Sequence, residues 1–278
     1  WGQNFIFSGI PEMFGPTGYV TGDLDGDGDL DLVAAGDANP CRLLVLKQDG
    51  GIYAGIDHEP MGAGQGLCGG NEALALGDVD ADGDLDLVAQ GRDNTTTPRL
   101  LLFLNNDGTL AQQPDVFEPG LWQGAVALGD VDNDGDLDLA ATGQDNGGAF
   151  RFLILQNNGS GAFAVSQEPW GAGQGFSFGS SLVFGDVDSD SDGDLDLLVS
   201  GESNNMGRGL NLFRNSGGTF TLDQQVMPQG QGVLSSHLAL GDTDQDGDLD
   251  LIAAGRTWDG VHDHVRLMSF TNSGGSFS

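Results

Sequence analysis

The chain has 278 residues and carries 42 acidic against nine basic side chains, so its formal net charge at pH 7 is −33. With so few lysines and arginines it lacks the basic surface that nucleic-acid binding needs, and an anionic membrane would repel it. No apolar run is long enough to cross a bilayer as a helix. We therefore expect no nucleic-acid partner and no membrane insertion.

Five similar units follow one another along the chain, at approximately 12–66, 67–119, 120–175, 176–231 and 232–278. Each contains an acidic loop, and a glycine follows the first aspartate of that loop at a fixed offset. These glycines recur at nearly equal intervals, so each repeat is one supersecondary unit. The glycines are Gly36, Gly91, Gly143, Gly201 and Gly255.

The apolar runs within a repeat predict strands. In the second repeat a short run at 73–76 precedes the acidic loop, an alternating segment at 85–89 follows it, and a third run spans 100–104. A polar turn at 105–108 then leads to a weaker fourth run. No long window has the apolar spacing of a helix. This pattern predicts an all-β fold with four antiparallel strands per repeat, as in a β-propeller.

The acidic loop has the pattern Asp-x-Asp-x-Asp-Gly-Asp-Leu-Asp, which places five carboxylates in one short segment. Such crowding is unfavourable without a cation, and flexible oxygen-only ligand sets favour calcium over zinc or copper. The alternative is a solvated acidic turn without metal. An EF-hand would need glutamate at position 12, where this chain has alanine or valine, so we expect the loop to join two strands.

These repeats resemble the FG-GAP/VCBS repeats of integrin α-subunit propellers and of many secreted bacterial proteins. The phenylalanine–glycine pair of that family is present at 178–179, loosely at 14–15, and is lost elsewhere. The resemblance covers nearly the whole chain. It implies a single domain, 1–278, forming a β-propeller of five four-stranded blades with a calcium loop between strands one and two of each blade.

The resemblance also implies about five calcium ions, one per repeat. In such loops the side chains at positions 1, 3, 5 and 9 and the backbone carbonyl at position 7 hold the ion. The fourth loop is longer than the others: counting back from Gly201 starts it at Asp188, which we prefer, and counting forward from Gly185 starts it at Asp186. The predicted ligands are Asp23, Asp25, Asp27, Asp29 and Asp31; Asp78, Asp80, Asp82, Asp84 and Asp86; Asp130, Asp132, Asp134, Asp136 and Asp138; Asp188, Asp190, Asp192, Asp194 and Asp196; and Asp242, Asp244, Asp246, Asp248 and Asp250.

The two cysteines, Cys41 and Cys68, fall in connections that emerge on the same rim of an up-and-down blade. A disulfide between them is geometrically feasible and would suit a secreted protein, and two unpaired thiols are the alternative. Asn94 and Asn158 begin matches to the glycosylation acceptor pattern.

Three weaker patterns leave alternatives open. An arginine opens the third strand of each repeat, which predicts either a basic ring for an anion or, preferably, an ion pair with the acid just upstream. Gly-x-Gly-Gln-Gly stretches near Trp122 and Trp170, with Trp258 in another rim loop, predict either sugar stacking or, preferably, glycine turns and packed tryptophans. His262 and His264 form a surface pair rather than a zinc site. The arginines and the acids upstream of them are Arg42, Arg99, Arg151, Arg208 and Arg266, with Asp37, Asp93, Asp145, Glu202 and Asp259.

The two ends of the chain compete for one strand. Residues 274–278 begin a fourth strand, and residues 5–11 resemble the end of one. We hypothesise that 1–11 completes the last blade, which closes the ring within one molecule. The alternative is an open edge that pairs with another copy to give an oligomer or filament. Because no signal peptide precedes Trp1, we expect a processed mature form or an excised fragment.

The sequence contains no nucleophile elbow, phosphate loop or plausible cysteine–histidine pair, so we predict that the chain is not an enzyme. The first functional hypothesis is a secreted, extracellular or cell-surface, non-catalytic recognition or adhesion module, or a structural subunit of an extracellular assembly. Its partner would be an extracellular protein or glycan. The alternatives are a lectin that uses its rim loops and a calcium-dependent polysaccharide-degrading enzyme.

Overall fold

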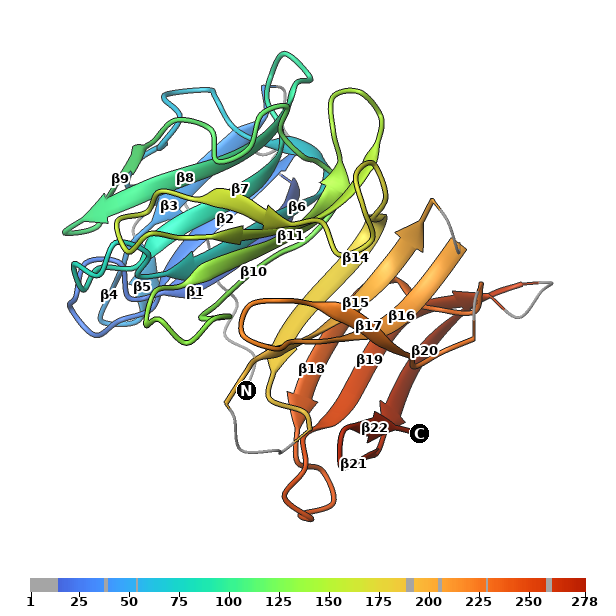
Figure 1. The fold of residues 1–278 in the computed structure, drawn as a ribbon. Coiled ribbons are helices and arrows are strands. Elements are labelled where there is room, and N and C mark those ends of the chain that lie inside the picture. Colours follow the sequence, from blue (N-terminus) through green and yellow to red (C-terminus); the bar gives the residue numbers. More distant parts are fainter. Residues whose placement is uncertain are drawn as a thin grey trace. The chain divides into compact units, whose positions relative to one another are not determined.

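The computed structural model describes residues 15–37, 40–53, 55–188, 193–204, 207–228, 230–258 and 262–278 (Figure 1). All regular structure in these residues is antiparallel β, which confirms the predicted fold class. By its internal contacts the chain divides into two compact units, Trp1–Trp122 and Gln123–Ser278. The prediction that residues 1–278 form a single domain stays a prediction.

The first unit contains two repeats. Repeat one is a three-stranded sheet, β1–β2–β3, followed by the short hairpin β4–β5, and repeat two is a four-stranded meander, β6–β7–β8–β9. The predicted four-stranded sheet is present in repeat two, whereas in repeat one the sheet has three strands and the hairpin is separate. The strands are β1 (Gly15–Gly22), β2 (Asp31–Asp37), β3 (Arg42–Leu46), β4 (Gln48–Asp49), β5 (Ile52–Tyr53), β6 (Cys68–Gly77), β7 (Asp86–Arg92), β8 (Pro98–Asn106) and β9 (Thr109–Gln112).

The second unit contains three repeats. Repeats three and four are four-stranded meanders joined by one pairing, Arg151 with Phe176, and repeat five is the sheet β18–β19–β20 followed by the hairpin β21–β22. The strands are β10 (Val126–Gly129), β11 (Asp138–Gln144), β12 (Phe150–Gln156), β13 (Ala164–Gln167), β14 (Phe176–Gly185), β15 (Asp196–Ser203), β16 (Gly207–Arg214), β17 (Thr221–Gln225), β18 (Leu234–Gly241), β19 (Asp250–Trp258), β20 (Asp263–Phe270), β21 (Asn272–Ser273) and β22 (Ser276–Phe277).

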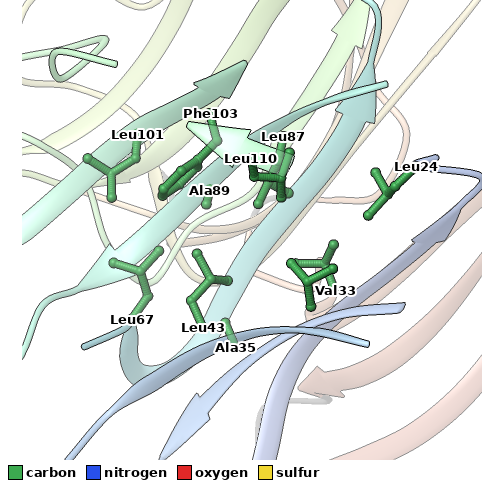
Figure 2. Close-up of a cluster of buried hydrophobic side chains, with 11 residues drawn as sticks. Leu24, Val33, Ala35, Leu43, Leu67, Leu87, Ala89, Leu101, Phe103 and Leu110 are labelled. Atoms are coloured by element: carbon green, nitrogen blue, oxygen red, sulfur yellow. The ribbon is translucent and has the colours of Figure 1, made fainter. Parts of the chain in front are cut away.

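The middle strands of a repeat are largely buried, because successive sheets within a unit pack against one another. In β7 every residue from Asp86 to Gly91 is buried. One core lies between repeats one and two, where Val33 and Leu43 face Leu87 and Phe103 (Figure 2). Further cores lie between repeats three and four and between repeats four and five. Burial between successive sheets is the dominant stabilising contribution, at about 25 cal/mol per Å² of apolar surface.

A disulfide joins Cys41 to Cys68, with the two Cα atoms 5.5 Å apart. It ties the connection between β2 and β3 to the first residue of β6, and so links repeats one and two. The two cysteines are therefore bonded to each other and are not the two unpaired thiols of the alternative. Closing a loop between residues 27 positions apart stabilises the fold by about 3 kcal/mol in the chain-entropy account.

Residues 1–11, which we predicted to complete the last blade, lie outside the described residues. At the other end, β21 and β22 form a hairpin whose Phe277 is buried in the core between repeats four and five. Ring closure therefore stays a prediction. Within the part of the chain that the structure describes, no helix has the length and apolarity needed to cross a membrane.

Candidate metal sites in the aspartate loops

Each aspartate loop connects the first and second strands of its repeat, as predicted. The last residue of the first strand is a glycine, and it pairs directly with the ninth-position aspartate that opens the second strand. This shared register gives all five loops the same base. The pairs are Gly22 with Asp31, Gly77 with Asp86, Gly129 with Asp138, Gly185 with Asp196, and Gly241 with Asp250.

The ninth-position aspartate is buried and organises the loop. Asp86 is 0% exposed, and its two carboxylate oxygens accept hydrogen bonds from the backbone N–H groups of Val79, at 2.9 Å, and Asn105, at 2.8 Å. The first N–H belongs to the loop and the second to the end of the third strand. The carboxylate therefore fixes the loop against its own sheet. Asp31, Asp138 and Asp250 accept the equivalent pairs of hydrogen bonds.

Burial raises the pKa of Asp86 and of Asp138 to about 6; hydrogen bonds from backbone N–H groups oppose the rise, and neighbouring loop carboxylates add to it. Burial likewise raises the pKa of Asp31. In the fifth loop the pKa of the ninth-position aspartate, Asp250, is instead lowered, because the hydroxyl of Thr243 donates a hydrogen bond to its carboxylate. The second and third loops thus hold a carboxylate whose charge is costly unless a cation lies nearby.

The first- and fifth-position aspartates fold the loop back on itself. Asp78 accepts hydrogen bonds from the backbone N–H groups of Asp82 and Gly83, and Asp82 accepts one from Asp84. Gly83 has φ of +100°, a backbone conformation that favours glycine, and a Cβ there would meet nothing within 4 Å. The turn therefore requires this glycine for its backbone conformation rather than for space.

Among the described residues, which leave out 189–192 of the fourth loop, carboxylates converge in four of the loops. In each of these loops three ligand oxygens, one from each aspartate, lie within 4.8 Å of one another. Four oxygens in these groups are buried and have no hydrogen-bond partner: Oδ1 of Asp23, of Asp25, of Asp80 and of Asp132. An unpartnered buried carboxylate oxygen is costly, and an all-oxygen donor set suits a hard divalent cation. The residues present therefore fit a calcium ion. The groups are Asp23, Asp25 and Asp27; Asp78, Asp80 and Asp86; Asp130, Asp132 and Asp138; and Asp242, Asp244 and Asp246.

The seventh-position side chain accepts a hydrogen bond from a backbone N–H in the turn that follows the third strand. Asp84 accepts a hydrogen bond from the backbone N–H of Asp107, at 2.9 Å, in the turn between β8 and β9. Asp29, Asp194 and Asp248 accept the equivalent bond from Gly50, Gly217 and Gly274. This arrangement agrees with the predicted division of roles, in which position 7 would offer only its backbone carbonyl to an ion.

A recurring asparagine joins the first, third and fourth loops to the repeat that follows each of them. The side-chain amide of Asn105 in repeat two donates to the carbonyl of Leu24, the second residue of the first loop, at 2.8 Å, and to that of Leu85 at 3.1 Å. Asn215 makes the same pair of bonds to Val131 and Leu195. Sequence reasoning placed Asn105 and Asn157 only in a polar turn. The signal that would have found their role is the recurrence of Asn105, Asn157, Asn215 and Asn272, which follow their ninth-position aspartates at a nearly constant spacing.

The fourth loop follows a different register from the preferred one. Val187 is fully buried, and its carbonyl accepts a hydrogen bond from the side chain of Asn272, as the second residue of the other loops does. Asp186 is therefore the first position and Asp188 the third, which corrects the count that began at Asp188. The extra length comes after Asp188; Asp190 and Asp192 lie outside the described residues.

Among the described residues, four of the five predicted third-strand arginines form ion pairs: Arg42, Arg99, Arg151 and Arg208. Arg99 binds Asp93 at 3.1 Å, as preferred, and also Asp115 at 2.5 Å. Arg151 binds Asp145 and Glu168 in the same way. Arg42 pairs with Glu59, and Arg208 with Asp263. Sequence reasoning missed Glu59, Asp115 and Glu168, which lie downstream of the third strand of the same repeat, and Asp263, which opens the third strand of the next repeat. These contacts depend on how the chain folds back and not on local spacing. The proposed partners Asp37 and Asp259 have no described side chain.

The rim motifs favour packing over ligand binding. Trp170 stacks on Phe176 with ring centroids 4.3 Å apart, and the guanidinium of Arg92 lies 3.2 Å from the ring centre of Trp122. A Cβ on Gly66 would lie 2.0 Å from the backbone of Arg42, so the last glycine of this motif is required by a close approach to β3. His262 and His264 have ring centroids 6.4 Å apart.

The fold and the loops define an all-β repeat protein with clusters of aspartates that could hold metal ions. The family model of the FG-GAP-like repeat matches residues 23–89, 78–141 and 188–253. The chain belongs to the FG-GAP-like repeat family, which confirms the predicted resemblance and is consistent with a β-propeller. No curated protein matches the chain significantly.

Several solved structures are similar over most of the chain at low identity. A candidate exo-β-1,3-galactanase from Bifidobacterium bifidum s17 is 12% identical, with a TM-score of 0.47, covering 96% of this chain and 88% of its own. A thermostable family-43 glycoside hydrolase is 11% identical, with a TM-score of 0.44 and coverages of 95% and 94%. A GH43 β-xylosidase/α-arabinofuranosidase from a compost microbial metagenome, solved with xylotriose in calcium-free form, is 13% identical, with a TM-score of 0.45 and coverages of 96% and 96%.

These neighbours contradict two predictions made from the sequence, that the chain is a non-catalytic recognition or adhesion module and that it is not an enzyme, because all three are described as carbohydrate-cleaving enzymes. The error came from treating the absence of familiar catalytic motifs as evidence against catalysis. A pair of carboxylates that acts on a sugar has no local sequence signature. At these TM-scores and identities the likeness assigns no activity to this chain.

Proposed function

We propose that the chain is a calcium-binding propeller in which ions held by the aspartate loops neutralise buried carboxylates and lock successive repeats together. The observation that carries this proposal is the set of buried carboxylate oxygens without hydrogen-bond partners at Asp23, Asp25, Asp80 and Asp132, each within a convergent group. A loop that needed no cation would pair these oxygens with N–H donors or expose them to water.

In the first, second, third and fifth loops, the proposed ligands are the side chains at positions 1, 3, 5 and 9 and the backbone carbonyl at position 7. The use of the seventh-position side chain by a turn N–H supports this division. When bound, the ion supplies the positive charge that the loop lacks. Four ions would add eight positive charges to a chain of formal charge −33.

Ion binding is coupled to packing between repeats through the second residue of the loop. Leu24 donates its N–H to the buried Asp31, accepts from Asn105 of the next repeat, and places its side chain in the core between the two repeats. Ordering of the loop by an ion therefore orders this interface as well. We expect metal binding and folding to be linked.

The five repeats are proposed to form the five blades of one propeller domain. Extracellular calcium modules bind at about 10⁻⁴–10⁻³ M, so the proposed sites would fill in a calcium-rich extracellular setting, and we place the protein there. The disulfide between Cys41 and Cys68 supports the same location, because such bonds persist in oxidising compartments.

The test is to count calcium per chain by native mass spectrometry and to follow thermal unfolding, with Asp80→Asn as the probe variant. Asp80 lies in the second group and carries an unpartnered oxygen. The variant should bind one ion fewer than the parent chain. As a matched control, Asp107→Asn makes the same charge change at an exposed turn residue and should bind the parental number. A parent chain that binds no calcium at millimolar concentration would contradict the proposal.

The alternative predicted from the sequence, a calcium-dependent polysaccharide-degrading enzyme, is tested separately. The calcium-loaded chain is incubated with neutral and acidic plant polysaccharides, and new reducing or unsaturated ends are measured. The result does not bear on the metal sites, which are judged by ion counting alone.

A further inference from the structure

One side-chain position connects the third strand to the aspartate loop of the same repeat. It is the residue just before the one whose backbone N–H donates to the ninth-position aspartate. We call it the flanking position. It is occupied by Lys47, Leu104, Gln156, Arg214 and Thr271 in repeats one to five.

Where the flanking residue is long and polar, it reaches the third-position carboxylate of its own loop. Lys47 Nζ lies 3.4 Å from Asp25 Oδ2, and Gln156 Nε2 donates to Asp132 Oδ2 at 2.7 Å. Both contacts leave Oδ1 of the same aspartate buried and unpartnered. The first and third loops therefore keep a carboxylate oxygen available for an ion.

Arg214 enters its loop further than the other flanking residues do. Its Nη1 lies 3.3 Å from Asp188 Oδ2, at the third position, and donates to Asp196 Oδ2, at the ninth position, at 2.6 Å. Asp196 is 3% exposed, and the Arg214 side chain is 19% exposed. One guanidinium nitrogen therefore bridges the third- and ninth-position carboxylates of the fourth loop. In the second and third loops, the carboxylates at these two positions belong to the convergent groups.

A guanidinium at this place acts as a cation that cannot be exchanged. It keeps its charge throughout the accessible pH range and has no lone pair with which to bind a metal. A divalent ion between the same carboxylates would meet both the N–H groups and the positive charge at close range. Like charges at about 4 Å repel strongly in a partly buried site, so we expect the ion to bind at least about tenfold more weakly there.

The arginine also supports the neighbouring repeat. Its Nε donates to Asp223, at 3.2 Å, and its Nη2 to the carbonyl of Gly275 in the turn between β21 and β22. In repeat five this turn follows Asn272, which itself binds the carbonyl of Val187 in the fourth loop. The side chain thus links the fourth loop to the next repeat, which is the task that we assign to the ion elsewhere.

We propose that Arg214 replaces calcium in the fourth loop, so that repeats four and five are joined without metal and the chain binds four ions rather than five. This inference rests on the proposed function, because it assumes that the other four loops bind calcium. It revises the prediction of one ion per repeat. The chain would then contain two kinds of junction, one that depends on the calcium concentration and one that does not.

The experiment counts calcium ions per chain by native mass spectrometry at millimolar calcium, for the parent chain and for Arg214→Leu. Leucine is the flanking residue of repeat two, so the variant copies a side chain that this position accepts. We expect four ions in the parent chain and five in the variant. Arg208→Leu is the matched control, because it removes the same charge from the same repeat but its ion pair is with Asp263. It should bind four ions.

A second pair of variants keeps the test valid if Arg214→Leu fails to fold. Asp188→Asn and Asp80→Asn remove the third-position carboxylate from the fourth and second loops. We expect four ions in the first variant and three in the second. Five ions in the parent chain, or a loss of one ion in Asp188→Asn, would overturn the inference while leaving the proposed function intact. Four ions in a folded Arg214→Leu variant would also overturn it. No ions in any variant would defeat the proposed function itself.

Discussion

The second and fourth aspartate loops share the same frame but differ at the flanking position. In both, a buried ninth-position aspartate pairs with a glycine of the first strand and accepts a hydrogen bond from the backbone of the third strand. The second loop has Leu104 at the flanking position and retains an unpartnered oxygen on Asp80, whereas the fourth has Arg214 between Asp188 and Asp196. On our proposal, this one side chain decides whether a loop needs an ion from solution. Experiments that remove the ion or one of its ligands should separate the two kinds of loop.

Removal of calcium should have the largest effect. At about 10 mM calcium, roughly 10 to 100 times the expected Kd, one site stabilises the fold by about 1.4–2.7 kcal/mol, so four sites contribute roughly 6–11 kcal/mol. That figure is comparable to the whole stability of a typical domain, about 5–15 kcal/mol. We expect excess EGTA to unfold the chain or to lower Tm by more than about 15 °C, as followed by circular dichroism. Potassium chloride at matched ionic strength should not restore the loss, and calcium should.

Substitution of the ninth-position aspartate should distinguish the loops directly. Asp86→Asn removes a charge and places an amide against two N–H donors, so we expect a loss of about 2–4 kcal/mol and of one bound ion. Asp196→Asn should also destabilise, because Arg214 loses a partner, but the ion count should not change. Asp107→Asn, at an exposed turn residue, is the control and should bind the parental number of ions. The comparison fails if both ninth-position variants lose an ion.

The pH dependence of the calcium-free chain should reflect the buried carboxylates. The pKa of Asp86 and of Asp138 is about 6 in the fold, above the ordinary value of 3.8, so the fold binds more protons than the unfolded chain between these values. Their ionisation opposes folding, and stability from these groups is lost as pH rises through about 6, by up to about 3 kcal/mol each. In EGTA, Tm should therefore increase as pH falls from 8 to 5.

With calcium present the sign should reverse, because protons compete with the ion for the same carboxylates. Thermal melts across this pH range, with and without calcium, measure both slopes. Parallel slopes in the two conditions would contradict a role for these carboxylates in ion binding.

The asparagine contacts between repeats should give the smallest effect. Asn105→Ala removes two donors to the carbonyls of Leu24 and Leu85, which should cost about 1–3 kcal/mol and weaken the ion in the first loop. Asn272→Ala removes one bond to Val187 in the fourth loop and one to Leu249 in its own fifth loop, so it should destabilise and weaken calcium binding in the fifth loop alone. Isothermal titration with calcium measures the affinity. Asn106→Ala, at an exposed neighbouring residue, should change neither quantity.

The sequence predicted what depends on local spacing and missed what depends on contacts between repeats. The acidic loops, their glycines and the strands around them follow from short local patterns, and the structure places them as predicted. The contact of Asn105 with Leu24 joins residues 81 positions apart, and no local pattern defines it. The same applies to Arg214: its length and charge are visible in the sequence, but its entry into the fourth loop depends on the third strand ending beside that loop.

The register of the fourth loop shows the same limit. Counting back from Gly201 is reasonable when only spacing is known. The structure instead aligns Val187 with Leu24 and Val131, because all three residues are buried and each accepts a hydrogen bond from the asparagine of a neighbouring repeat. The functional prediction rested on the absence of local catalytic motifs, and such an absence says little, because carboxylates that act on a sugar are brought together by the assembled fold.

The most direct test of the two kinds of loop is a crystal structure of the chain grown with terbium in place of calcium, with anomalous scattering measured at the terbium edge. We expect one anomalous peak in each of the first, second, third and fifth loops, which makes four peaks. In the fourth loop we expect the Arg214 guanidinium between the carboxylates and no peak. A peak between Asp188 and Asp196, or no peaks in the other four loops, would contradict this expectation.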